Sequence, residues 1–261
     1  MKLENKVAII TGGAMGIGKG IVEKFLEYGA KVSIFDMSDK LEDTVKEFAQ
    51  KGYTVIGNTV DIRDVSQVKK AVLNTKERFG KIDILVNNAG VAKIVDFREM
   101  RDEIRDFHFD INIKGAWNVT KAAVEDIIAN KGAIVNMASV TGNMVADPGE
   151  VAYATTKAAM KGFTKGLAAE LADSGVRVNA ISPGYILTPM VNGIAKDSSP
   201  DNPKAVVDGI AVAIPLKRLG TPAEVGELAA FLASYEASYL TGQEFVIDGG
   251  STLPETSTVG Q

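Results

Sequence analysis

The stretch Lys6-Val-Ala-Ile-Ile-Thr-Gly-Gly-Ala-Met-Gly-Ile-Gly18 decides the fold class of this chain. Its apolar start, residues 6–11, is typical of a buried strand, and the apolar residues within 21–26 share one face of a helix. A glycine turn between a strand and a helix lets the backbone approach a phosphate, which the helix N-terminus then binds. The spacing is G-x-x-x-G-x-G, not the G-x-G-x-x-G of the commonest dinucleotide fingerprint. The stretch therefore predicts a nucleotide-binding unit.

Strands and helices alternate along the rest of the chain. The expected strands are 6–11, 31–36, 54–60, 82–87, 133–138, 176–182 and 244–247, and the expected helices are 17–28, 39–50, 65–79, 100–129, 151–172 and 222–234. Alternation with near-continuous apolar strands predicts a parallel sheet covered on both faces. We expect an α/β fold in which residues 1–261 form one domain, a doubly wound, Rossmann-type, parallel seven-stranded sheet.

The least regular region is residues 190–216, where Pro200, Pro203 and Pro215 stand among small and polar residues. A linker and a mobile lid over a substrate both fit this composition. Because no second domain follows the region, we favour the lid.

Composition excludes several classes of function. The chain has 261 residues, 46% hydrophobic content and a formal charge of −4, so we expect neither a nucleic acid nor a membrane as partner. The absence of cysteine excludes disulfides and thiolate catalysis. His108 is the single histidine, and no loop has calcium or magnesium spacing, so we expect no metal site. Without an apolar leader or a membrane-length apolar run, we expect a cytoplasmic location.

Tyr153 and Lys157 are four residues apart in a helical pattern and should leave one helix face together. A free tyrosine titrates near pH ~10, and a lysine ammonium one turn away lowers the pKa of the phenol. The pair is then a usable general acid or base. The alternative is an ordinary half-buried tyrosine beside a solvated lysine.

Five motifs occur in an order known from one protein family. They are Thr11-Gly12-x-x-x-Gly16-Ile-Gly18, Asn87-Asn-Ala-Gly90, Ser139, Tyr153-x-x-x-Lys157 and Pro183-Gly184. With these motifs essentially the whole chain resembles the short-chain dehydrogenases/reductases. The resemblance implies an enzyme that interconverts an alcohol and a carbonyl by hydride transfer to or from a nicotinamide nucleotide.

The resemblance also implies catalytic roles for Asn112, Ser139, Tyr153 and Lys157. Tyr153 and Ser139 bind the carbonyl oxygen, and Tyr153 donates the proton in the reduction direction. Lys157 lowers the tyrosine pKa and binds the nicotinamide ribose, and Asn112 holds a water that resupplies the proton. The alternatives are a surface serine at a strand end and a core-facing asparagine amide.

The implied cofactor contacts lie at the carboxyl ends of the strands. They are Gly12, Met15, Gly16, Ile17, Gly18, Asp36, Asp61, Ile62, Asn88, Ala89, Gly90, Tyr153, Lys157, Pro183, Gly184, Ile186 and Thr188. Asp61 matches an adenine contact, and the turn at 87–90 matches one that packs on the cofactor and braces the sheet. The Ile186 backbone and the Thr188 hydroxyl match groups that hold the nicotinamide amide.

Asp36 predicts the choice of nucleotide. It ends the second strand, eighteen positions after Gly18, where an acidic side chain meets the adenosine ribose. A carboxylate accepts from both ribose hydroxyls of NAD but repels the 2′-phosphate of NADP. Lys19 and Lys40 are the nearest cations, and we expect both to point to solvent. The alternative, that Asp36 caps the next helix, suits Ser38 better.

The sequence thus predicts an NAD-dependent oxidoreductase, NADP being the less favoured cofactor, with a small-molecule alcohol or carbonyl substrate of unidentified structure. By resemblance we expect a homo-oligomer, a tetramer or dimer paired through residues 100–129 and 151–172. Two other functions stay open: an NADPH-dependent 3-oxoacyl-carrier-protein reductase, and a nucleotide-binding regulator without turnover. Glu150 is either a solvated charge or a contact to a polar substrate.

Overall fold

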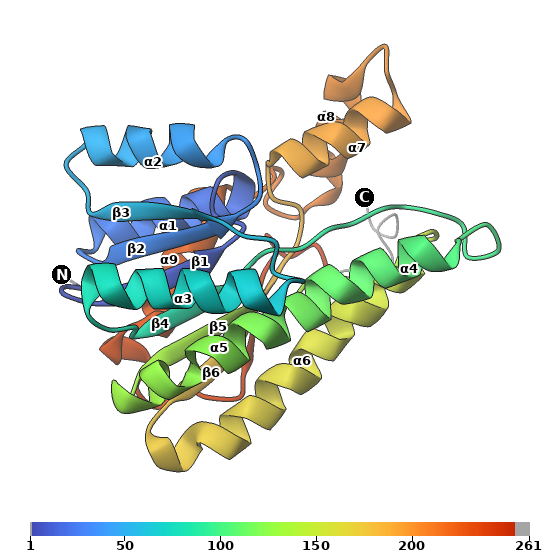
Figure 1. Ribbon diagram of the computed structural model, residues 1–261. Coiled ribbons are helices and arrows are strands. Elements are labelled where there is room, and N and C mark those ends of the chain that lie inside the picture. The colour runs from blue at the N-terminus through green and yellow to red at the C-terminus, as the bar shows by residue number, and fades with distance from the viewer. Residues whose placement is uncertain (1, 254–261) are drawn as a thin grey trace.

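The computed structural model describes residues 2–253 and contains a seven-stranded, entirely parallel sheet (Figure 1). The strands are β1 (Val7–Thr11), β2 (Lys31–Asp36), β3 (Val55–Thr59), β4 (Ile84–Asn87), β5 (Ala133–Met137), β6 (Arg177–Pro183) and β7 (Glu244–Ile247). Their order is β3-β2-β1-β4-β5-β6-β7, so the order reverses between β1 and β4. This confirms the predicted doubly wound sheet. Residues 1 and 254–261 of the predicted domain lie outside the described residues.

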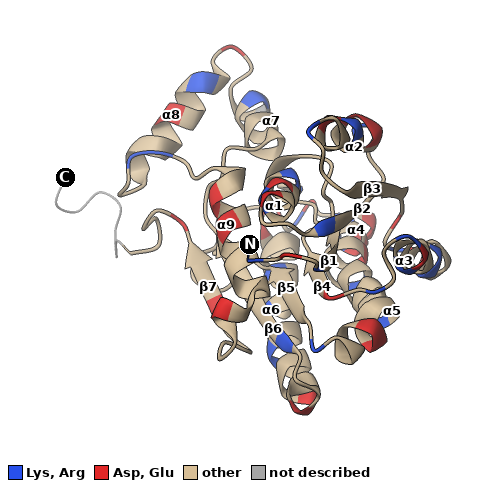
Figure 2. Ribbon diagram, turned by 90° about the vertical axis from the view of Figure 1, so that its left-hand side faces the viewer, with Lys and Arg blue, Asp and Glu red and all other residues tan. Residues whose placement is uncertain are grey.

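Helices cover both faces of the sheet (Figure 2). One layer is α1 (Gly16–Glu27), α2 (Leu41–Gln50) and α9 (Pro222–Ala233), and the other is α3 (Val65–Phe79), α5 (Ala116–Ala129) and α6 (Val151–Leu171). Phe25, Phe48 and Val225 belong to the apolar cluster of the first layer, and Val68 and Val119 belong to that of the second. Because both faces are covered, every residue of β1, β4 and β5 is buried, which explains why their sequences are mostly apolar.

The predicted single helix over 100–129 is wrong in detail. The structure has α4 (Asp102–Phe109), a π-helical turn (Asp110–Gly115) and then α5. A π turn contains one more residue than an α-helical turn, so its side chains point in directions that differ from those of a continuous α-helix. Apolar periodicity does not reveal such a turn. Asn112 lies inside it and is buried.

The region predicted to be irregular, 190–216, is mostly helical, which corrects the sequence interpretation. It contains α7 (Pro189–Ser198) and α8 (Pro203–Ala213), which stand beyond the sheet at the top of Figure 1. Thr188 and Asn202 cap the two helices with their side chains. Proline is favourable at the first position of a helix, so Pro189 and Pro203 begin helices instead of breaking them, while Pro200 and Pro215 lie outside the helices.

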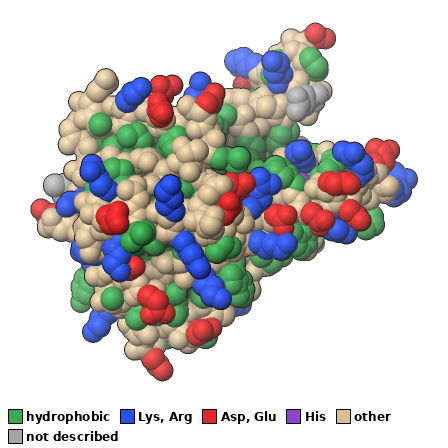
Figure 3. All heavy atoms as spheres, in the orientation of Figure 1, with side chains coloured by type: hydrophobic (Ala, Val, Ile, Leu, Met, Phe, Trp, Pro, Cys, Tyr) green, Lys and Arg blue, Asp and Glu red, His purple; other side chains and the backbone are tan. Residues whose placement is uncertain are grey.

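The remaining elements are the short 3₁₀ segments Ala172–Ser174 and Tyr235–Ala237. Among residues 2–253 we find no helix with the length and apolar character needed to cross a membrane. On the face drawn in Figure 3, acidic and basic side chains are interspersed.

Candidate active site

The glycine-rich turn between β1 and α1 has the backbone shape of a phosphate site. Gly12 and Gly16 have φ values of +65° and +53°, a region that other residues rarely adopt. A Cβ on Gly18 would lie 1.9 Å from the Gly12 carbonyl oxygen, so only glycine fits there. α1 begins with Met15 at its N-cap and no side-chain cap. Its first N–H groups and positive dipole end can therefore bind a phosphate, with Ile17 in the first turn.

The turn after β4 packs directly on this glycine turn. The Asn88 Nδ2 atom donates to the carbonyl oxygens of Thr11 and Gly12, both at 3.0 Å. The backbone N–H groups of Asn88 and Ala89 each donate to the Thr11 hydroxyl, also at 3.0 Å. These bonds join the ends of β1 and β4, where the strand order reverses and ligands of such sheets bind.

Asp36 ends β2 beside the same glycine turn. Its Oδ2 accepts from the Ala14 N–H at 2.9 Å, and its Oδ1 accepts from the Ser38 N–H at 2.9 Å. The Ser38 hydroxyl accepts from the Lys40 N–H ahead of α2. Lys19 forms an ion pair of 2.6 Å with Glu47. A carboxylate offers about four acceptor sites, so Asp36 keeps acceptor capacity toward a ribose.

Asp61 and Ile62 follow β3 at the same edge of the sheet. Arg63 binds the Asp61 carboxylate through two nitrogens, at 2.9 Å and 2.6 Å, and this holds the pKa of Asp61 below its usual range. The Ile62 side chain is buried, and its carbonyl oxygen accepts from the Asn118 side chain at 3.0 Å.

Tyr153 and Lys157 lie one turn apart on α6. Lys157 is 5% exposed, its Nζ donates to the Met137 carbonyl oxygen at 2.8 Å, and it lies 5.7 Å from the centre of the Tyr153 ring. Burial lowers the pKa of Lys157 to about 8. Burial also raises the pKa of Tyr153; the Ser139 side chain opposes this rise, and the Glu150 charge adds to it. For the protein groups alone, the expected lowering of the tyrosine pKa is therefore wrong, because desolvation of the phenol raises its pKa more than the neighbouring side chains lower it.

Ser139 follows β5 and meets Tyr153. Its side chain opposes the rise in the pKa of Tyr153, and its Oγ accepts from the Thr141 N–H at 3.1 Å. The serine is buried and belongs to the lining of the site, not to the outer surface.

The side-chain amide of Asn112 forms hydrogen bonds with neighbouring protein groups. Its Oδ1 accepts from the Val91 N–H at 2.8 Å, and its Nδ2 donates to the Val91 carbonyl oxygen and the Thr156 hydroxyl. A Cβ on Gly90 would lie 3.3 Å from Asn112 Oδ1 and 3.5 Å from Lys157 Nζ. Asn112 and Lys157 therefore flank Gly90, and the π turn brings the asparagine there.

The segment from Pro183 to Thr188 forms the opposite wall. Pro183 ends β6, and a Cβ on Gly184 would lie 2.7 Å from the Asp248 side chain. Ile186 is buried and pairs with Gly220 as an isolated bridge. The Thr188 side chain lies 3.6 Å from where a Gly16 Cβ would stand, so this wall faces the glycine turn. The Thr188 hydroxyl accepts from the Val191 N–H and can still donate its own proton.

Sequence reasoning missed Glu244, which supports the site from β7. Its Oε1 accepts from the Asn143 side chain at 2.7 Å and from the Ser182 hydroxyl at 2.6 Å. Its Oε2 pairs with Lys161 of α6 at 2.6 Å. The loop after Ser139 is thus tied to α6 and to two strands. The one local feature of the sequence that indicates this role is a glutamate in the otherwise apolar short strand β7.

The residues predicted from five separate motifs thus lie at one edge of the sheet, and the chain as a whole is similar to known proteins. A family model described as Enoyl-(Acyl carrier protein) reductase matches residues 12–252. Oxidoreductase UcpA of Escherichia coli K12 is 56% identical over 260 residues, 99% of each chain. The 3-oxoacyl-[acyl-carrier-protein] reductase FabG of Thermotoga maritima is 40% identical, covering 97% of this chain and 100% of its own.

The structure also superimposes on that of L-sorbose reductase from Gluconobacter frateurii, solved with NADPH and L-sorbose. The TM-score is 0.92 at 33% identity, with 97% of this chain and 100% of the other covered. With full-length matches in sequence and in structure, the chain belongs to the short-chain dehydrogenase/reductase family of NAD(P)-dependent enzymes.

Proposed function

We propose that the protein is an NAD-dependent oxidoreductase that interconverts an alcohol and a carbonyl. The observation that carries this proposal is the buried Lys157 Nζ 5.7 Å from the centre of the Tyr153 ring, with Ser139 beside the tyrosine. A bound nicotinamide supplies or accepts the hydride. In the reduction direction Ser139 and Tyr153 hold the carbonyl oxygen, and the Tyr153 hydroxyl donates its proton to that oxygen. In the oxidation direction Tyr153 takes the proton back.

Lys157 and Asn112 support the proton transfer in this proposal. An ammonium group beside Tyr153 stabilises the phenolate that remains after the proton has left. We propose that the same lysine also binds the ribose of the nicotinamide nucleotide. Asn112 holds Val91 beside Lys157 through two hydrogen bonds, and we assign to this corner the water that resupplies the proton.

Asp36 supports NAD as the cofactor. Its carboxylate is held by two backbone N–H groups at the glycine turn, and the nearby Lys19 is engaged by Glu47. A 2′-phosphate at this position would meet a negative charge in a partly desolvated cleft. The NADPH in the structure of L-sorbose reductase makes NADP the competing choice.

A 3-oxoacyl-carrier-protein reductase is the second candidate function, favoured by the 40% identity to a protein with that name. It would be expected to use NADPH, which Asp36 opposes. A regulator without turnover is less well supported, because it has no need for the Ser139–Tyr153 pair.

The decisive experiment is a turnover screen of alcohols, sugars, polyols, ketones and a 3-oxoacyl thioester, each with both nucleotides. Tyr153→Phe keeps the ring and removes the transferable proton, so kcat should fall by ~10²–10⁴. The dissociation constant of the nucleotide, measured by calorimetry, should change little. Unchanged turnover in a folded Tyr153→Phe protein contradicts the mechanism.

The lid belongs to the same proposal. Leu187, Met190, Val212 and Leu216 are exposed apolar residues in and beside α7 and α8. Closure of these helices over the site would bury them and exclude water from the reaction.

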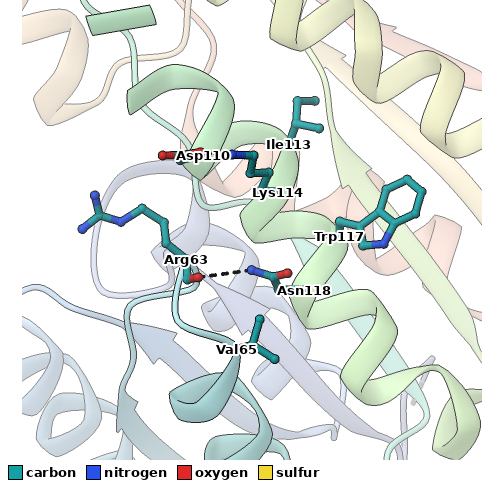
Figure 4. Close-up of a pocket in the computed structure, with 7 residues that line it drawn as sticks. All are labelled: Arg63, Val65, Asp110, Ile113, Lys114, Trp117 and Asn118. Carbon is teal, nitrogen blue, oxygen red and sulfur yellow. Dashed lines mark hydrogen bonds and ion pairs between the residues drawn. The ribbon is translucent and has the colours of Figure 1, made fainter. Parts of the chain in front are cut away.

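Assembly into a homotetramer and a cytoplasmic location are also proposals. Trp117 of α5 is 55% exposed, stacks on Phe163 of α6 at 5.1 Å and lines the surface pocket drawn in Figure 4. This pocket contains none of the four catalytic candidates. An exposed aromatic stack across two neighbouring helices supports their pairing with a second copy, which analytical ultracentrifugation tests.

A further inference from the structure

Glu150 has a buried atom whose position the fold does not explain. It stands at the N-cap of α6, three residues before Tyr153, and its side chain does not cap the helix. Its Oε2 is buried without a hydrogen-bond partner among the described residues. A carboxylate oxygen removed from water without a donor costs free energy. A ligand group that donates a hydrogen bond to this oxygen would offset the cost.

Glu150 lies beside the catalytic residues. Ser139 stands near the start and Glu150 at the end of the loop between β5 and α6, and Tyr153 lies in the first turn of α6. Within this loop the Thr141 N–H donates to the Ser139 hydroxyl at 3.1 Å. The Glu150 charge raises the pKa of Tyr153, and it raises the pKa of Tyr185 together with the charge of Asp147.

The neighbouring carboxylate of Asp147 is in a different position. Asp147 is exposed, whereas Glu150 is half-buried. The burial of Glu150, together with the charge of Asp147, raises the pKa of the Glu150 carboxyl group. A solvated surface charge would have no buried oxygen, whereas the Oε2 atom of Glu150 is buried. The geometry therefore selects the substrate-facing interpretation of Glu150.

We propose that Glu150 determines substrate specificity by accepting a hydrogen bond from a hydroxyl next to the reacting carbon. The substrates are then vicinal diols, polyols or hydroxyketones instead of simple alcohols. This inference rests on the proposed function, because it requires that the reacting oxygen is held by Ser139 and Tyr153.

The test compares two substrates that differ by one hydroxyl group: cyclohexane-1,2-diol and cyclohexanol. Wild-type protein should oxidise the diol with the higher kcat/KM. A hydrogen bond to a charged group contributes enough that Glu150→Ala should raise the KM for the diol about 10- to 100-fold. Glu150→Gln keeps one acceptor oxygen and should raise this KM less. The KM for cyclohexanol should stay within about twofold in both variants.

Asp147→Asn is the matched control, since it removes an equal charge from an exposed position of the same loop. It should change neither constant. Nucleotide affinity and melting temperature show that each variant is folded. An equal loss on both substrates, an unchanged diol KM in Glu150→Ala, or a preference for 2-aminocyclohexanol overturns the inference alone. If the wild-type protein turns over no alcohol or carbonyl compound of the wider screen with either nucleotide, the proposed function itself is contradicted.

Discussion

The Gly18→Ala substitution tests the packing of the phosphate-binding turn. The new methyl carbon would lie 1.9 Å from the Gly12 carbonyl oxygen and 2.6 Å from the Asn88 Nδ2 atom. The closest obstacle is backbone, so a rotamer change cannot relieve the overlap. The turn and α1 must move apart by about 1 Å to restore van der Waals contact. The hydrogen bonds from Asn88 to Thr11 and Gly12 would then be strained or lost.

Overpacking of this kind costs ~1–3 kcal/mol, and each lost hydrogen bond adds about 1 kcal/mol. For a chain of this size the melting temperature falls by roughly 2–4 °C per kcal/mol, so a loss of about 3–5 kcal/mol should lower it by about 6–20 °C. Nucleotide affinity should fall at least tenfold. Thermal unfolding followed by circular dichroism and calorimetric titration with NAD measure the two effects.

Gly166→Ala is the matched control, because Gly166 lies within α6 and its added methyl group meets nothing within 4 Å. An alanine inside a helix is better than glycine by about 1 kcal/mol, so this variant should melt slightly higher. A Gly18→Ala protein that melts within 2 °C of wild type and binds NAD equally well would refute the steric argument.

Three further predictions concern Lys157, Asp36 and the lid. The pKa of buried Lys157, about 8 against 10.5 in the unfolded chain, corresponds to a cost of about 3 kcal/mol below pH 8, relieved as the pH rises to 10.5. Because this cost disappears with the charge, the Lys157→Met protein should melt no lower than wild type at pH 7, although the loss of the proposed ribose contact should weaken its nucleotide binding. Calorimetry should show that the difference in melting temperature becomes smaller between pH 8 and 10.5. A difference that does not depend on pH would argue against a buried charge. Asp36→Arg should shift the ratio of kcat/KM from NAD toward NADP, with a smaller shift in Asp36→Asn, and wild-type efficiency that is equal or better with NADP would make the assignment wrong. Hydrogen exchange in residues 190–216 should be fast without ligand and slow with nucleotide and substrate, whereas uniformly slow exchange would indicate a rigid segment.

Much of the architecture was predictable because its signals are local. The apolar runs of β1 and β4 mark strands buried on both faces, and the glycine spacing marks a turn that only glycine can form. The prolines at 189 and 203 show the limit of this reasoning. Proline both ends and begins helices, and the caps Thr188 and Asn202 decide between the two.

The sequence by itself determined the parallel sheet, the nucleotide-binding turn and the identities of the four catalytic candidates, since periodicity and motif order are properties of the chain. Tertiary structure alone decided how those side chains act. A π turn aims Asn112 at Val91, and strands far apart in the chain place Glu244 under the Ser139 loop. The direction of the Tyr153 pKa and the buried oxygen of Glu150 depend on desolvation. Desolvation is set by every segment packed around a group, and no local pattern of residues records it.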